Sequence, residues 1–302
     1  MITSLTATVQ TSSRLRAGTD DRVWLDVGGA TFELLKSGTN LFEAGHADAF
    51  VLPLPEGGLH AADVWRVLLC KSPDRDPDGW TVGGVTLVDQ TGKVLYARAG
   101  LEARVDASSG RAWLAPDFAG AKPPETFLLG SEVIRTLLEL KLHESIQGNI
   151  GPLQNVKPKG ALRLTCECDG IRIEQTVRGR IAATDVDVVV SAGLMPFVVH
   201  ATATEPARTE IAIRGLHIDI KMPTWLHVVT MGVTGLVEVA LEKQLPGKLR
   251  ETLTKQLGGK LSDIGLDVSK VDRFAIRPGA LEVIMERAPL PEFRPFPFRW
   301  RP

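Results

Sequence analysis

Cysteine is scarce in this chain, which has three in 302 residues, Cys70, Cys166 and Cys168. Three cysteines are too few for a disulfide framework, and an odd number cannot all pair within the chain. We therefore expect free thiols and a reducing, cytoplasmic location. Cys166 and Cys168 would share one face of a strand. We interpret them as buried apolar residues rather than a zinc pair, because no further Cys or His pair at zinc spacing is near them.

A secretory signal, a long hydrophobic run and an excess of one charge are also missing. Residues 1–5 contain neither a basic start nor an apolar run, so we expect no secretory signal. The longest apolar stretch, residues 225–241, is shorter than the roughly 20 residues that cross a bilayer, and we interpret it as a buried helix. The 35 Lys and Arg residues nearly balance the 36 Asp and Glu residues, which argues against a nucleic-acid partner. Peripheral contact with a membrane stays open.

Short alternating or β-branched stretches separated by turns fill the first part of the chain. They lie at residues 3–10, 23–27, 31–34, 50–54, 64–69, 80–88 and 93–97. Gly28 and Gly29 join two of them as a hairpin. Many short strands without helical periodicity predict an all-β sandwich, which we place at residues 1–118.

The motifs of this part occur in a particular order. A Gly18-Thr19-Asp20 turn precedes one apolar strand, Phe42-Glu43 with Gly45 and Asp48 precedes the next, and Gly79-Trp80 leads into a third. In this order the region resembles the PLAT domain, the sandwich attached to lipoxygenases, pancreatic-type lipases, polycystins and clostridial alpha-toxin. The resemblance implies a module that directs the protein to a membrane or to a protein partner.

Calcium is the cofactor that this resemblance implies. The matching positions for loop carbonyls and acidic side chains are Gly18, Thr19, Asp20, Glu43 and Asp48. Calcium takes hard oxygen ligands, which both loops offer. The alternative is that Asp20 and Asp48 cap turns and remain solvated.

The character of the chain changes after a Gly, Lys and Pro linker at residues 119–124. Ser131 is a plausible N-cap of an amphipathic helix with an apolar stripe at Ile134, Leu138, Leu142 and Ile146. Asp169-Gly170 between two alternating runs predicts a hairpin. Further strands are expected at residues 181–190, 197–204 and 208–220, the last with a bulge near Gly215.

A long helical region at residues 223–257 follows, interrupted by Pro246-Gly247. A closing hairpin is expected at residues 271–276 and 281–285. These elements predict an α+β domain at residues 125–288, an antiparallel sheet wrapped on a long helix. Its element order resembles a TULIP-type lipid-binding domain, the fold of bactericidal/permeability-increasing protein. The resemblance implies a ligand held between sheet and helix by Trp225, Leu226, Val229, Val233, Val237 and Leu241.

Proline and arginine alternate with aromatic residues in the tail, residues 289–302, which should therefore be extended. Phe296, Phe298 and Trp300 are suited to contact a membrane interface. The alternative is that they pack back onto the surface of the chain itself.

Motifs of catalysis are not found in the sequence. There is no Gly-x-Ser-x-Gly nucleophile elbow, no phosphate-binding loop and no paired histidines at helical spacing. We therefore predict a non-enzymatic protein that binds a lipid or other hydrophobic ligand, with a sandwich that targets it to a membrane or protein. The alternative is a structural or protein-interaction component of a larger assembly without a small-molecule ligand.

Overall fold

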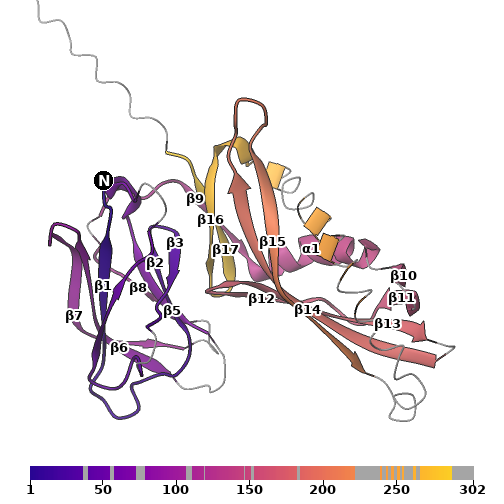
Figure 1. Cartoon of the computed structure of the whole chain (residues 1–302), viewed down its shortest axis with the longest axis horizontal. Helices are drawn as coiled ribbons and strands as arrows, with labels where there is room; N and C mark the ends of the chain where they lie inside the picture. The colour runs from indigo at the N-terminus through magenta and orange to yellow at the C-terminus, as the bar shows by residue number, and fades with distance from the viewer. Residues whose placement is uncertain are drawn as a thin grey trace, which may run out of the picture.

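The structure is a computed structural model. It describes residues 1–36, 40–54, 58–72, 79–106, 111–118, 120–145, 147–150, 153–181, 184–221 and 266–287, and isolated residues between 239 and 262. We call the part with strands β1–β8 the N-terminal half and the part with β9–β17 the C-terminal half (Figure 1).

Two four-stranded antiparallel sheets form the N-terminal half, in the orders β4-β1-β6-β7 and β3-β2-β5-β8. The strands are β1 (Leu5–Thr11), β2 (Val23–Val27), β3 (Ala30–Glu33), β4 (Ala47–Val51), β5 (Val67–Lys71), β6 (Trp80–Asp89), β7 (Val94–Val105) and β8 (Trp113–Leu114). In β1 buried residues alternate with more exposed ones, as expected for a strand with one face on a core. The predicted β-sandwich is confirmed.

Strands β2 and β5 depart from this alternation, because every residue in them is buried. Val23, Leu25 and Val27 of β2 belong to the sandwich core. The residues between them face outward, and Trp24 packs there with Leu68, Cys70 and Cys168 in a separate cluster. The C-terminal half therefore covers the outer face of this sheet. We call this contact the junction.

The C-terminal half contains a six-stranded sheet in the order β10-β11-β13-β14-β15, with β12 paired to β13, and a three-stranded sheet in the order β16-β17-β9. The smaller sheet lies between the sandwich and the long strands β14 and β15 (Figure 1). The elements are β9 (Thr126–Gly130), α1 (Ser131–Ser145), β10 (Gly148–Ile150), β11 (Leu153–Pro158), β12 (Arg163–Glu167), β13 (Gly170–Ile181), β14 (Thr184–Val199), β15 (Arg208–Lys221), β16 (Val271–Arg277) and β17 (Ala280–Met285).

One apolar core joins helix α1 to both sheets. Ile134, Leu138 and Leu142 are buried at helical spacing on one face of α1, as the sequence predicts. They share the core with alternate residues of β14, such as Val186 and Val188. The hairpin predicted at Asp169-Gly170 is confirmed, although its turn residues are Cys168 and Asp169 and Gly170 begins β13. The closing hairpin of β16 and β17 is also confirmed.

The expected strand at residues 197–204 is wrong as a separate element, because β14 continues from Thr184 to Val199. Pro196 does not break the strand, because it lies beyond Leu194, which forms the last pair of β14 with β13. At that point a missing N–H costs no ladder bond to β13. The bulge is confirmed, since the register between β14 and β15 shifts opposite Gly215, which has a φ of 56°.

Most of the predicted long helix at residues 223–257 lies outside the described residues. The residues described there are in helical conformation: Val239, Lys243, Pro246, Gly247, Arg250, Glu251 and Thr254. Within the described residues, no helix has both the length and the apolar character that crossing a bilayer requires.

Candidate ligand-binding site

The two acidic loops predicted from the sequence lie side by side in the sandwich. The backbone N–H of Thr19 donates to the carbonyl of Phe42 over 3.3 Å. A Cβ atom at Gly18 would come within 2.9 Å of the same carbonyl oxygen, so only glycine allows this approach. The predicted positions Gly18, Thr19, Glu43 and Asp48 are thus brought together.

The polar groups of these loops are bound to one another. The Asp48 carboxylate accepts a hydrogen bond from the Phe42 N–H at 2.8 Å, and Glu43 accepts one from Asn40. The ammonium of Lys71 contacts the carboxylate of Asp21 and lies 3.5 Å from the Thr19 hydroxyl. Among the described residues, no three His, Cys, Asp or Glu side chains are grouped to hold a metal ion. The described side chains therefore do not form a calcium site by themselves, and calcium binding stays a prediction.

The other predicted site residues lie outside the described residues. These are Trp225, Leu226, Val229, Val233, Val237 and Leu241 for the ligand, and Phe296, Phe298 and Trp300 for the membrane. Their roles stay predictions.

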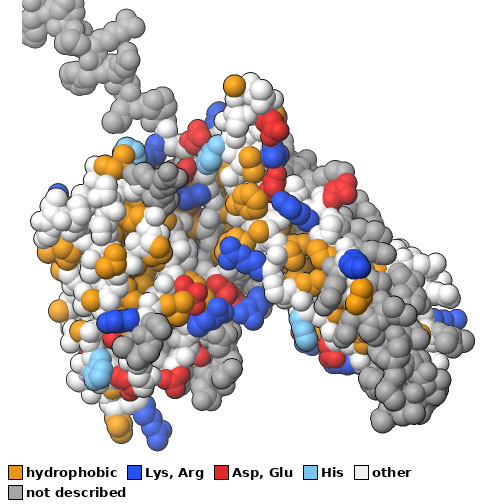
Figure 2. All heavy atoms as spheres, viewed as in Figure 1, with side chains coloured by type: hydrophobic (Ala, Val, Ile, Leu, Met, Phe, Trp, Pro, Cys, Tyr) orange, Lys and Arg blue, Asp and Glu red, His pale blue; other side chains and the backbone are white. Residues whose placement is uncertain are grey.

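A cavity of about 690 Å3 opens at the junction, between β2 and β3 of the sandwich and β13, β14 and β16 of the C-terminal half. Figure 2 shows Lys and Arg side chains gathered in the recess between the two halves, with acidic side chains beside them. We call this the junction cavity. Its large apolar lining residues are Trp24, Ile173, Leu194, Met195, Phe274 and Ile276, and its charged lining is Arg22, Arg172, Arg214, Glu33 and Asp169.

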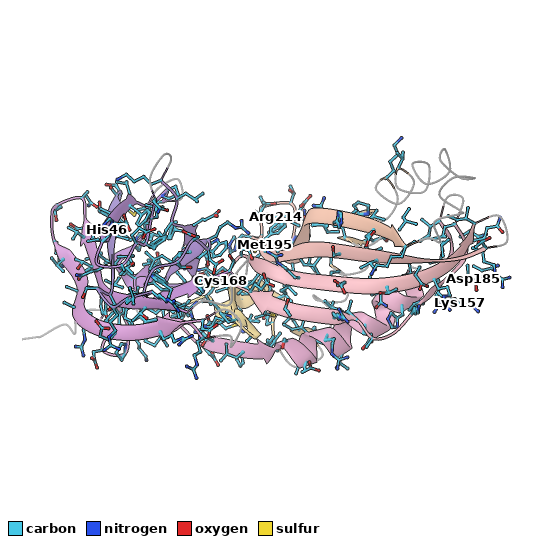
Figure 3. All side chains as sticks on the ribbon, turned by 90° about the horizontal axis from the view of Figure 1, so that it is seen from below. His46, Lys157, Cys168, Asp185, Met195 and Arg214 are labelled. Carbon is cyan, nitrogen blue, oxygen red and sulfur yellow. A yellow bond between two sulfur atoms is a disulfide. The ribbon has the colours of Figure 1, made fainter. Side chains whose placement is uncertain are left out.

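Turns and a bulge place the charged groups of the junction cavity. Cys168 and Asp169 form the turn between β12 and β13, at the end of the sheet that faces the sandwich. Arg214 precedes Gly215 at the bulge of β15 and pairs with Gly193 of β14. Figure 3 shows Cys168, Met195 and Arg214 together at this end of the sheet, with Lys157 and Asp185 at the opposite end.

Two of the three arginines in the cavity are paired. Arg22 Nη2 lies 3.2 Å from Asp169 Oδ2 and Arg22 Nη1 lies 3.7 Å from Glu33 Oε1. The same guanidinium lies over the Trp24 ring, 5.0 Å from its centroid. Arg172 Nε lies 2.6 Å from Glu167 Oε2. No hydrogen bond or ion pair joins Arg214 to any described residue.

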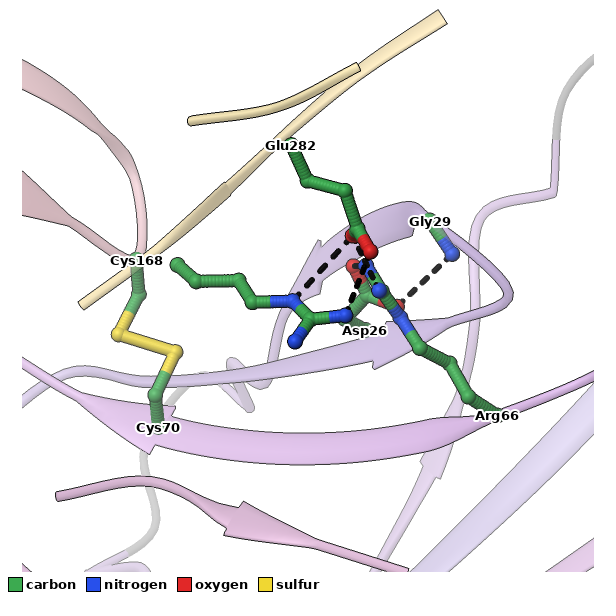
Figure 4. A network of polar contacts seen from close by, with 7 residues as sticks. Asp26, Gly29, Arg66, Cys70, Cys168 and Glu282 are labelled. Atoms are coloured by element: carbon green, nitrogen blue, oxygen red, sulfur yellow. Dashed lines mark hydrogen bonds and ion pairs between the residues drawn. A yellow bond between two sulfur atoms is a disulfide. The ribbon is translucent and has the colours of Figure 1, made fainter. Parts of the chain in front are cut away.

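A second part of the junction is closed and contains a buried ion network (Figure 4). The Arg66 guanidinium donates to both carboxylate oxygens of Asp26 at 2.9 Å and also contacts Glu282 of β17. Arg66, Asp26 and Glu282 are only 4%, 3% and 1% exposed. Burial disfavours the charged guanidinium, but the hydrogen bonds and charges of both carboxylates outweigh it, so the pKa of Arg66 is raised.

A disulfide between Cys70 of β5 and Cys168 joins the two halves beside this network (Figure 4). The expectation that all three cysteines are unpaired is therefore wrong. Cys70 and Cys168 are 98 residues apart, so nothing in the sequence near either cysteine indicates that they pair. Cys166 is free and buried, and burial together with the neighbouring Glu167 raises the pKa of its thiol to about 12.

Sequence reasoning missed the junction as a site. It assigned no role to charged residues such as Asp26, Arg66 and Glu282, because each lies alone among apolar neighbours. The predicted bulge at Gly215 was the one available signal, since bulges re-aim neighbouring side chains. The bulge therefore indicates that the side chain of its neighbour Arg214 departs from the regular alternation of the strand.

No family model matches the chain, and the comparison with curated proteins finds no match. Among solved structures, the alpha-toxin from Clostridium absonum is 17% identical with a TM-score of 0.32, over 37% of this chain and 31% of that chain. Coral 8R-lipoxygenase is 23% identical with a TM-score of 0.30, over 37% of this chain and 16% of that chain. A lipopolysaccharide binding protein is 14% identical with a TM-score of 0.22, over 59% of this chain and 54% of that chain.

The chain thus spans about a third or less of the alpha-toxin and the lipoxygenase. At TM-scores this low the likenesses assign neither fold nor function. The β-sandwich is established by its own two sheets. The resemblances to PLAT and TULIP-type domains stay predictions.

Proposed function

We propose that the chain is a non-enzymatic protein that binds a lipid or another apolar small molecule in the junction cavity. The observation that carries this proposal is the cavity itself, with a volume of about 690 Å3 and six large apolar side chains in its lining. Ligand pockets typically measure about 300–1,000 Å3 and combine an apolar lining with a few polar groups. Binding would derive from burial of apolar ligand surface, at about 25 cal/mol per Å2.

The chemistry of the lining supports binding rather than catalysis. The described lining residues include no histidine, and the only cysteine among them, Cys168, has its sulfur in the disulfide. Ser191 and Thr31 therefore have no imidazole in the lining to act as a general base. A lipid-surface hydrolase would need catalytic groups elsewhere in the chain.

The sandwich would bring the protein to a membrane or protein surface. Leu15 is 92% exposed, and the arginines on either side of it, Arg14 and Arg16, are exposed as well. Its loop lies against the second acidic loop, because the N–H of Gly45 donates to the carbonyl of Ser12 at 2.9 Å. An apolar side chain flanked by cations suits an anionic bilayer surface.

Ligand binding is tested by extracting the purified protein with organic solvent and analysing the extract by mass spectrometry. We expect a released lipid or other apolar molecule, and saturable binding when a fatty acid is added to the extracted protein. Empty extracts combined with no binding of added oleate or oleyl alcohol would contradict the proposal.

Membrane contact is tested by flotation with vesicles that contain anionic phospholipid, with calcium and with chelator. We expect Leu15→Ser to reduce the bound fraction, whereas Leu35→Ser, which changes another exposed leucine of the sandwich, should leave it unchanged. Equal flotation of both variants would exclude the Leu15 loop as the contact. A calcium requirement would support the predicted ligands in the two acidic loops.

The alternative function, a structural component of a larger assembly, makes different predictions. It requires a stable oligomer or complex in light scattering and a cavity that binds none of the added ligands. A peripheral, cytoplasmic location stays a prediction. Because the cytoplasm keeps thiols reduced, the oxidation state of Cys70 and Cys168 in cells tests it.

A further inference from the structure

We infer that the junction cavity takes an anionic amphiphile, whose acidic head group pairs with Arg214 and whose apolar part lies against Met195. This inference rests on the proposed function and adds the chemical class of the ligand. It depends on the charge balance of the cavity and on the register of β14 and β15.

The charge balance of the cavity favours an anion. Its charged lining has three arginines and two acids, a net charge of +1. Both acids are within 4 Å of arginine nitrogens, Glu33 of Arg22 and Asp169 of Arg22 and Arg172. The charge left without a described partner is therefore on Arg214. The positive charge of Arg214 would repel a cationic ligand, and a neutral ligand would form no ion pair with it.

The register places Arg214 beside an apolar surface. Arg214 pairs directly with Gly193, and directly paired side chains of neighbouring strands lie on one face of a sheet. Met195 is two residues from Gly193 on the same strand, so it also lies on that face. Met195 is thus the diagonal neighbour of Arg214, within reach of a long side chain.

Two glycines, Gly193 and Gly215, leave space beside Arg214. A Cβ atom at Gly193 would lie 3.3 Å from the Arg214 carbonyl oxygen and 3.9 Å from the Arg214 Cβ, where the present glycine leaves space. Gly215, next to Arg214, has a φ of 56°, a conformation that favours glycine. The bulge and the two glycines together present a guanidinium at the mouth of a partly apolar cavity.

Arginine matches the geometry of carboxylate, sulfate and phosphate groups, each of which can accept two parallel hydrogen bonds. A free fatty acid and a lysophospholipid both combine such a group with an apolar chain. The shared chemistry is an acidic head on an acyl chain, and the two sources are separated by experiment.

The test uses the full chain after lipid extraction and isothermal titration with four probes: oleate, lysophosphatidate, oleyl alcohol and inorganic phosphate. The variants are Arg214→Met, which keeps an unbranched apolar stem, and Arg214→Lys, which keeps the charge. Arg180→Met is the matched control, because it removes an exposed arginine of β13 that pairs with Asp185 at the far end of the sheet.

We expect Arg214→Met to weaken binding of the acidic amphiphile by about 10- to 100-fold, the usual value of a charge-assisted hydrogen bond. Arg214→Lys should retain part of the affinity, Arg180→Met all of it, and oleyl alcohol should bind wild type and Arg214→Met alike. Preference for oleate or for lysophosphatidate identifies the source of the head group.

Two results overturn the inference while leaving the proposed function intact. One is equal binding of oleate and oleyl alcohol with no effect of Arg214→Met. The other is binding of inorganic phosphate as tight as that of the amphiphiles, which would show that no apolar chain is needed. Binding of none of the four probes would contradict the proposed function itself.

Discussion

The junction has a closed side and an open side, and each contains an arginine in a different state. On the closed side Arg66 is almost fully buried, and two carboxylates surround it. On the open side Arg214 is exposed and has no partner among the described residues. The two arginines lie in the same contact between the halves, so their surroundings account for the difference.

The difference follows from the cost of removing charge from water. A buried ion without a partner costs several kcal/mol, so Arg66 is tolerated only with Asp26 and Glu282 in place. An exposed guanidinium keeps its hydration and can remain unpaired at little cost. The closed side therefore fixes the two halves against each other, and the open side keeps a cation available to a ligand.

Removing the charge of Arg66 should have the largest effect. Arg66→Met leaves Asp26 buried without its bidentate partner, and Arg277 is then the one cation paired with Glu282 among the described residues. We expect a loss of about 3–5 kcal/mol in the free energy of unfolding, measured by chemical denaturation.

Arg98→Met is the matched control, because Arg98 is paired with Asp117 at 3.3 Å and both side chains are half-exposed or more. It should cost less than about 1 kcal/mol. Similar losses in the two variants would mean that the buried network does not hold the closed side together.

Opening the disulfide should have the next largest effect. The double variant Cys70→Ala/Cys168→Ala removes a link that closes a loop of 98 residues. We expect a loss of about 2–4 kcal/mol in the free energy of unfolding, and wild type in reductant should behave like the variant.

Thiol counting checks the pairing directly. The denatured, unreduced protein should present one reactive thiol, that of Cys166, and three thiols would refute the disulfide. In the native protein this thiol should not react near pH 8, because burial raises its pKa to about 12 and keeps it protonated.

Steric overlap at Gly29, which lines the junction cavity and donates to the buried Asp26, should have an intermediate effect on stability. Gly29 has a φ of 94°, and a Cβ atom there would lie 2.4 Å from Cδ1 of the buried Ile284 in β17. Gly92 has a φ of 82° in a turn of the sandwich, with nothing within 4 Å of its Cβ position.

Both glycines have a positive φ that strains alanine, so Gly29→Ala and Gly92→Ala differ mainly in the contact with Ile284. We expect Gly29→Ala to lower the free energy of unfolding by about 1–3 kcal/mol more than Gly92→Ala. Equal losses would indicate that the two halves separate easily at this point.

Features set by neighbours in sequence were predictable. The alternation of β1, the hairpin of β12 and β13 and the stripe of Ile134, Leu138 and Leu142 all depend on local sequence patterns. The boundary between β14 and its expected successor was missed, because the effect of Pro196 depends on where β13 ends.

The junction depends on contacts between distant residues. Arg66 and Glu282 are 216 residues apart, and nothing near either one indicates the other. An isolated charge in an apolar strand, such as Asp26 in β2, has the same local sequence whether its face meets water or another sheet. Only the placement of the C-terminal half decides between the two.

Removing a charge that is paired but exposed to solvent should have the smallest effect on the free energy of unfolding. At the end of the six-stranded sheet remote from the junction, Asp187 accepts hydrogen bonds from Arg178 and Lys159, which lower its pKa to about 2. The native state therefore binds a proton less readily than the unfolded chain, whose aspartates have a pKa of about 3.9. The resulting stabilisation is complete above that pH and is lost as the pH falls towards 2.

Asp187→Asn should lower the free energy of unfolding by no more than about 1 kcal/mol at pH 7, because water and salt screen these exposed pairs. The difference from wild type should shrink in high salt and also as the pH approaches about 3. Urea denaturation at both pH values measures it. A loss as large as that of Arg66→Met would show that pairing alone, without burial, determines what these charges contribute to stability.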